Sequence, residues 1–168
     1  MIAATKPATG ALLHVLGHAL MKGCLFLAAG GVIWTGRTAS VHGVSGLSGR
    51  LPWTTAGFTL AAISMIGLPP TVGFFSKWYL LLGAAEAGAW TYVLVLVASS
   101  LLTAVYFFRL IERAYFQPPP PEHEGEPALE LPAAMRWPVL VMSAGVLLVG
   151  VFNQRIVSTV IAFALPDL

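Results

Sequence analysis

The sequence predicts an all-α integral membrane protein with about four transmembrane helices, the second of which is broken between Gly67 and Gly73. Three observations support this fold class. The chain is 57% hydrophobic and only 10% charged, whereas a soluble domain carries about 25% charged residues. Its mean hydropathy is +0.82, and apolar segments of the ~20 residues that cross a bilayer recur along it. The longest of them is interrupted near its centre by glycines and prolines.

The charge pattern and the cysteine content exclude other classes of protein. The net charge of +2 is small and scattered, which argues against a nucleic-acid partner. The single cysteine, Cys24, lies inside an apolar run, so no disulfide framework exists. Nothing resembles a nucleotide loop, a catalytic triad, or a haem or iron–sulfur ligand set. The sequence therefore predicts no cofactor, no metal site and no catalytic residue.

The first transmembrane segment, residues 10–34, carries three ionisable side chains: His14, His18 and Lys22. Each four-residue step turns a helix by 40° net, so the three share one face. Histidine and lysine side chains can gain and release protons, and such groups can pass protons through intervening waters. The spacing therefore indicates a proton relay.

Other interpretations of this face remain open. The three groups could be satisfied by helix packing, with the lysine extended to the membrane interface. The two histidines four residues apart could also begin a metal site. A third histidine, cysteine or carboxylate ligand is missing nearby, which argues against a metal.

The second segment, residues 53–83, would be roughly 46 Å long as a straight helix, well beyond the ~30 Å hydrocarbon core. Gly67, Pro69, Pro70 and Gly73 favour a break in its middle. Lys77 follows the break, and a cation in hydrocarbon costs roughly 2.5–3.5 kcal/mol. Discontinuous helices mark ion sites in transporters. Lys77 beside the break is thus the main functional clue and a candidate ion site; the alternative is a lysine that extends to the outer interface.

The rest of the chain is expected to form two more spans and a soluble connection. A third segment covers residues 90–108, and Arg109, Glu112 and Arg113 after it are typical of an interfacial anchor. Prolines and glutamates then predict a solvated linker. We expect three domains: residues 1–116 with the relay motifs, a loop over residues 117–134, and a C-terminal transmembrane helix within residues 135–168.

Positive charges predict the orientation. The two long connections carry five arginines, at positions 37, 50, 109, 113 and 136, against Lys6 and Arg155 on the other side. By the positive-inside rule, both termini lie outside and both long loops are cytoplasmic.

Four sequence motifs resemble one family of membrane proteins. Residues 14–30 (His-Val-Leu-Gly-His-Ala-Leu-Met-Lys-Gly-Cys-Leu-Phe-Leu-Ala-Ala-Gly) are followed by Gly-Leu-Ser-Gly-Arg-Leu-Pro at 46–52. Then come Gly-Leu-Pro-Pro-Thr-Val-Gly-Phe-Phe-Ser-Lys at 67–77 and Tyr-Phe-Phe-Arg-Leu-Ile-Glu-Arg-Ala-Tyr-Phe at 106–116. Their order and spacing resemble the antiporter-like subunits of respiratory complex I and of Mrp-type Na⁺/H⁺ antiporters, with the D-type Mrp subunit as the nearest in appearance.

The resemblance covers the C-terminal portion of such a subunit only. It implies proton translocation through His14, His18, Lys22 and Lys77 as part of a multisubunit membrane complex, with Na⁺/H⁺ antiport in an Mrp setting. The chain itself would be a transporter segment, and in complex I it would be part of an NADH:quinone oxidoreductase. The family's first repeat, with its glutamate–lysine pair, is absent here, so half of the relay would come from another polypeptide, and the sequence would be either a fragment or one part of a split subunit. Its partners would be the other membrane subunits of the complex, and the resemblance implies an energy-transducing membrane, namely that of a bacterial cell. A non-conducting structural or assembly subunit is the alternative.

Overall fold

The computed structural model describes residues 2–36, 40–121, 124–125 and 129–161. Within these ranges every regular element is helical. The elements in chain order are α1 (Ile2–Trp34), η1 (His42–Val44), α2 (Leu47–Arg50), α3 (Pro52–Ile66), α4 (Val72–Glu86), α5 (Trp90–Phe116), α6 (Ala133–Val151), α7 (Asn153–Ile156) and the π-helical turn η3 (Val157–Ile161).

The predicted fold class is confirmed. The helices α1, α5 and α6 are each long and apolar enough to cross a membrane. The helices α3 and α4 have 15 residues each, or about 22 Å apiece, too short to cross alone. They are the two halves of the predicted broken helix. Several helices exceed their expected bounds: α1 already begins at Ile2, α4 continues to Glu86, α5 continues to Phe116 beyond the interfacial arginines, and α6 begins at Ala133 inside the predicted loop.

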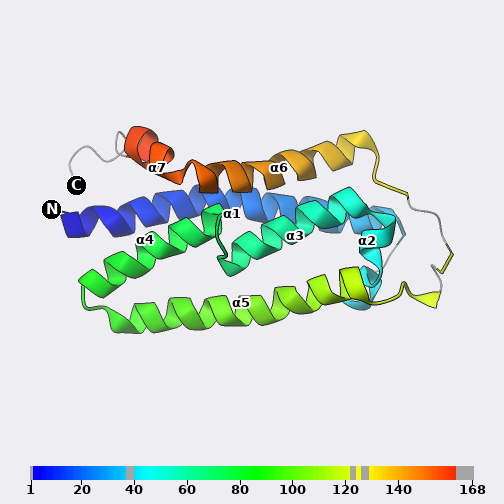
Figure 1. Cartoon of the computed structure of the whole chain (residues 1–168), viewed down its shortest axis with the longest axis horizontal. Helices are drawn as coiled ribbons and strands as arrows, with labels where there is room; N and C mark the ends of the chain where they lie inside the picture. Colours follow the sequence, from blue (N-terminus) through cyan, green and yellow to red (C-terminus); the bar gives the residue numbers. More distant parts are fainter. Residues whose placement is uncertain (1, 37–39, 122–123, 126–128, 162–168) are drawn as a thin grey trace.

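The helix α1 lies at the centre of the bundle (Figure 1), where it packs against α3, α4 and α6. The helices α1, α3 and α6 meet around Cys24, whose thiol lies within donating distance of the backbone carbonyls of both Gly57 and Val139. A Cβ atom at Gly57 would lie only 2.7 Å from Val139, so the small side chains allow α1, α3 and α6 to approach closely. The helix α5 lies at one side of the bundle and contacts α3 and α4.

One expectation about the linker is wrong, because Glu130 is a helix cap and not a solvated linker residue. Its carboxylate accepts hydrogen bonds from the backbone amides of Trp53 (2.8 Å) and Thr54 (3.4 Å), and from the Thr54 hydroxyl (2.6 Å). Leu51, the residue before α3, makes no capping bond with its side chain. The glutamate therefore supplies the cap from another part of the chain. Glu124 is exposed, whereas Glu122 and Glu126 lie outside the described residues.

Most of the described arginines lie at one end of the bundle. The C-terminal ends of α1 and α5, the helix α2 and the start of α6 gather at one end of the bundle (Figure 1). This end carries Arg50, Arg109, Arg113 and Arg136, whereas Arg155 lies in α7 at the opposite end. Arg37 lies outside the described residues, as does the side chain of Lys6. Which end faces the cytoplasm remains a prediction.

Candidate functional site

The break between α3 and α4 is a tight connection of five residues. Gly67 ends α3 with φ = +97°, a left-handed conformation that favours glycine. The backbone amides of Gly67 and Leu68 both donate to the carbonyl of Ile63, at 3.1 and 3.2 Å. The peptide bond between Pro69 and Pro70 is cis. The chain re-enters helix at Val72, so the break lies within the predicted Gly67–Gly73 segment.

Gly73 lies inside the first turn of α4, and it sets how closely the two half-helices approach. Its backbone amide donates to the Ser64 hydroxyl at 3.1 Å. A Cβ atom at Gly73 would overlap the Ser64 backbone carbonyl, so only glycine fits without displacement. The C-terminal end of α3 is thereby held directly against the N-terminal end of α4.

Lys77 reaches back across this break. Its ammonium donates to the carbonyls of Met65 (2.8 Å) and Ile66 (3.1 Å), the last two residues of α3. The third bond goes to the Ser100 hydroxyl of α5 at 2.9 Å. An ammonium has three N–H donors, and here all three have acceptors. Because the C-terminal end of a helix is the negative end of its dipole, the α3 carbonyls stabilise the cation without a carboxylate.

A cavity of about 290 Å³ adjoins Lys77 between α4 and α5. Lys77 and Ser100 line it together with apolar side chains such as Phe74, Trp78 and Leu96. One water occupies about 30 Å³ in the liquid, so the cavity has room for several. The ammonium and the Ser100 hydroxyl are thus the polar groups that border a space large enough for water.

His14 approaches the same break from α1. Its Nδ1 lies 3.0 Å from the Ser76 hydroxyl, and Ser76 donates to the Gly73 carbonyl at 3.2 Å. With that donor used, the Ser76 oxygen accepts a proton from Nδ1–H of His14. Ser76 directly precedes Lys77 in α4. The hydrogen bond of His14 therefore joins α1 to α4 one residue before the lysine.

Two glycines in α1 make this approach possible. A Cβ atom at Gly10 would lie 2.9 Å from the Leu80 backbone, and one at Gly17 would lie 2.8 Å from Val72. The two glycines are seven residues apart, so they share one helical face with His14 between them. The α1 backbone therefore lies close against α4 at the level of the histidine.

The other two predicted relay residues continue along α1, away from the break. The His14 and His18 ring centroids are 5.5 Å apart, and the Lys22 ammonium lies 5.8 Å from the centre of the Phe26 ring, within cation–π range. All three are half-buried. Among the described side chains, no hydrogen bond joins His18 to Lys22. Eight residues separate His14 from Lys22, or about 12 Å along the helix.

The sequence pattern did not identify Ser64 and Ser76, although both hold the break together. Both are fully buried, and serine in an apolar helix gives little signal by itself. The spacing of Ser76, three residues after Gly73 and one before Lys77, is the signal that could have indicated it. Among the described residues, no three histidine, cysteine or acidic side chains gather as a metal site.

Comparison with known proteins places the chain in one family. The family model described as "NADH:quinone oxidoreductase/Mrp antiporter, TM" matches residues 1–103. The chain is 55% identical over 167 residues to the N subunit of the NADH-quinone oxidoreductase of Desulforudis audaxviator, covering 94% of this chain and 33% of that protein. It is 34% identical over 140 residues to the D subunit of a Na⁺/H⁺ antiporter of Bacillus subtilis, covering 80% and 28%. The identity is thus higher to the oxidoreductase subunit than to the antiporter subunit.

Two solved structures share the fold. The Mrp complex from Dietzia sp. DQ12-45-1b matches with a TM-score of 0.74 at 23% identity, over 88% of this chain and 35% of the matched chain. Respiratory complex I from Thermus thermophilus also gives a TM-score of 0.74 at 23% identity, over 90% and 34%. The chain spans about a third of the length of the oxidoreductase and antiporter subunits that it matches.

Proposed function

Because the chain belongs to the NADH:quinone oxidoreductase/Mrp antiporter transmembrane family, we propose that it forms one half-channel of a proton-translocating membrane complex. Protons pass along Lys22, His18 and His14 on α1 and through Lys77 at the helix break. The other half of the path, including an acidic group, comes from polypeptide beyond these residues. Other membrane subunits of a complex I-like or Mrp-type assembly surround it, and Na⁺ takes part only in an Mrp-type assembly.

The hydrogen bonds of Lys77 carry this proposal. Two of its acceptors, the carbonyls of Met65 and Ile66, can only accept. The third, the Ser100 hydroxyl, can accept from the ammonium or donate to the neutral amine after a rotation about its C–O bond. The site can therefore satisfy the lysine in both protonation states, as a proton carrier requires.

The histidine face supplies the neighbouring step. Imidazole can take up a proton on one nitrogen and release one from the other, which suits it to a chain of donors and acceptors. His14 contacts Ser76, one residue from Lys77, and the tilted His18 ring is its next neighbour. Water between the imidazole of His14 and the ammonium of Lys77 would complete the connection between these groups.

The orientation follows from the positive charges. We infer that the arginine-rich end of the bundle, with the α1–α3 and α5–α6 connections, faces the cytoplasm. Both termini then lie on the other side of the membrane.

A structural or assembly subunit is the second candidate, and one observation favours it. The three bonds of Lys77 are also those expected of a fixed positive charge that caps α3 permanently. The two functions differ in whether the lysine must release its proton.

Replacing Lys77 by arginine separates them. Guanidinium keeps its charge and can still donate to the α3 carbonyls, but it cannot be deprotonated. We expect Lys77→Arg and Lys77→Ala both to abolish proton flux in vesicles that carry the assembled complex at normal abundance. Arg155→Lys, a charge-preserving change at the opposite end of the bundle, should leave flux intact. Normal flux in Lys77→Arg would identify Lys77 as a fixed charge and defeat the relay.

A further inference from the structure

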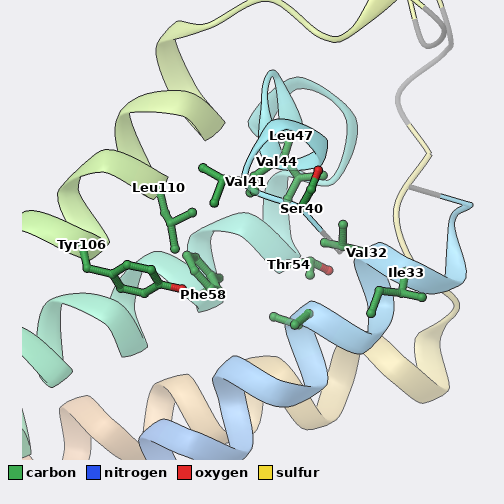
Figure 2. A pocket seen from close by; sticks show the side chains of 12 residues that line it. Val32, Ile33, Ser40, Val41, Val44, Leu47, Thr54, Phe58, Tyr106 and Leu110 are labelled. Carbon is green, nitrogen blue, oxygen red and sulfur yellow. The ribbon is translucent and has the colours of Figure 1, made fainter. Parts of the chain in front are cut away.

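A second pocket lies far from Lys77, at the arginine-rich end of the bundle (Figure 2). It has a volume of about 200 Å³. Side chains from α1, the loop before α2, α3 and α5 converge on it, among them Ile33, Val41, Phe58, Tyr106 and Leu110. Apart from the hydroxyls of Ser40, Thr54 and Tyr106, the side chains that line it are hydrocarbon. This pocket is suited to an apolar ligand.

A cationic pocket of about 310 Å³ adjoins the apolar one. Arg109 and Arg113 line it, and Val41, Tyr106 and Leu110 belong to both pockets. The two arginines are one helical turn apart on α5, so they face the same side. Among the described residues, the charged side chains that line it are these two arginines. Glu112 is exposed on α5 and is not part of its lining.

The two pockets follow the direction of the membrane normal. Three exposed tryptophans mark this end of the bundle: Trp34 at the end of α1, Trp53 at the start of α3 and Trp137 at the start of α6. Tryptophan is enriched at the membrane–water interface. Phe58, five residues or about 7 Å beyond Trp53 along α3, lines only the apolar pocket, whereas Arg113, near the end of α5, lines only the cationic one. The hydrocarbon part of the site thus lies on the membrane side and the cationic part on the water side.

The apolar pocket is also open to its surroundings. Ile33 is 51% exposed and Tyr106 is 58% exposed, although both line it. At the edge of a bilayer, lipids can reach such an opening from the side. A water-soluble anion would contact the arginines alone and would leave the apolar pocket empty.

We propose that these joined pockets bind one anionic phospholipid, with an acyl chain beside Phe58 and Leu110 and the phosphate against Arg109 and Arg113. Basic pockets between transmembrane helices are suited to anionic headgroups. Because the ligand contacts α1, α3 and α5 together, it holds α5 to the rest of the bundle at this end. The site is separate from the relay and does not depend on it.

Lipid binding by the purified, delipidated protein in detergent tests this site. Native mass spectrometry counts bound lipid during titration with phosphatidylglycerol, with zwitterionic phosphatidylcholine or with inorganic phosphate. We expect saturable binding of one phosphatidylglycerol and no comparable binding of the other two. Each basic residue near a membrane surface contributes about fivefold in affinity, so Arg109→Gln should weaken binding by about 5-fold and the double variant with Arg113→Gln by about 30-fold.

Two further variants make the result decisive. Ala29→Phe places a ring in the apolar pocket and should remove saturable phosphatidylglycerol binding while both arginines remain. Arg155→Gln removes one arginine at the opposite end of the bundle, and this variant should bind phosphatidylglycerol with the affinity of the unchanged protein.

Three outcomes would overturn the proposal. One is equal affinity for phosphatidylcholine, which would mean an apolar groove without headgroup recognition. Another is equal binding of inorganic phosphate that Ala29→Phe leaves unchanged, which would mean an anion site without a lipid. The third is unchanged phosphatidylglycerol affinity in Arg109→Gln. This single variant is enough for the test, even if the double variant does not fold.

Discussion

Replacing Glu130 by alanine should loosen the start of α3 while the rest of the bundle stays folded. Within the described part of the chain, Glu130 is the side chain that caps α3, because Leu51 makes no capping bond with its side chain and Pro52 has no amide hydrogen. Glu130 accepts from the amides of Trp53 and Thr54, which are the second and third helical positions that a cap normally satisfies. The variant would leave both amides without this acceptor.

The expected cost is about 2 kcal/mol. Hydrogen bonds to a charged group contribute about 1.5–3 kcal/mol, and loss of a helix N-cap costs about 0.5–2 kcal/mol. Glu130 is half-buried and Trp53 is exposed, so solvent screening favours the region where these two ranges overlap. Glu130→Gln keeps one acceptor oxygen and should cost about half as much.

Hydrogen–deuterium exchange of the purified protein in detergent measures this loss of stability at individual backbone amides. About 2 kcal/mol corresponds to a loss of roughly 30-fold in protection at the amides of Trp53 and Thr54. The matched control is Glu124→Ala, which removes an exposed carboxylate from the same connection and should change protection by less than about twofold. Equal exchange at the start of α3 in both variants would refute the capping role of Glu130.

Three other substitutions test the break and its lysine. Gly73→Ala should cost about 1–3 kcal/mol of stability by overpacking and lower the thermal unfolding midpoint. The control is Gly30→Ala, where a Cβ atom meets open space, and its midpoint should not fall. Equal midpoints in the two variants would contradict the close packing at Gly73. Gly67→Ala forces a left-handed residue and should cost about 1–2 kcal/mol in the same measurement. Ser100→Ala should reduce proton flux about tenfold or more at normal assembly, since a hydrogen bond to a charged group is lost. Exposed Ser99→Ala is its control, and equal flux in the two variants would remove Ser100 from the proposed mechanism.

The broken helix could be predicted because its signals are local. Glycine and proline restrict the backbone wherever they occur, and a span that exceeds the bilayer must bend or break. The common face of His14, His18 and Lys22 followed from helical geometry alone. The ends of α1 and α5 were less predictable, because the apolar pattern marks the hydrocarbon core and a helix can continue past it.

The cap on α3 and the support of Lys77 depend on contacts between distant residues. Glu130 lies 76 residues from Thr54, in a segment whose composition is that of a solvated linker. Ser76 and Ser64 are conspicuous only once α1 and the two half-helices are in place around the break. No periodicity along one helix encodes such partners, since each depends on which neighbour the fold brings near.

The helix α5 packs against the bundle mainly through its C-terminal half. Its buried residues, Phe107, Leu110 and Ala114, all lie in the C-terminal part, while the half that begins at Trp90 is largely exposed. Ser100 lies seven residues from Phe107, or about 10 Å from this pivot. A 10° swing about the pivot displaces Ser100 by about 2 Å, enough to break its 2.9 Å bond to Lys77. A small tilt of this outer helix would thus break the Ser100–Lys77 hydrogen bond without any displacement of α1, α3 or α6.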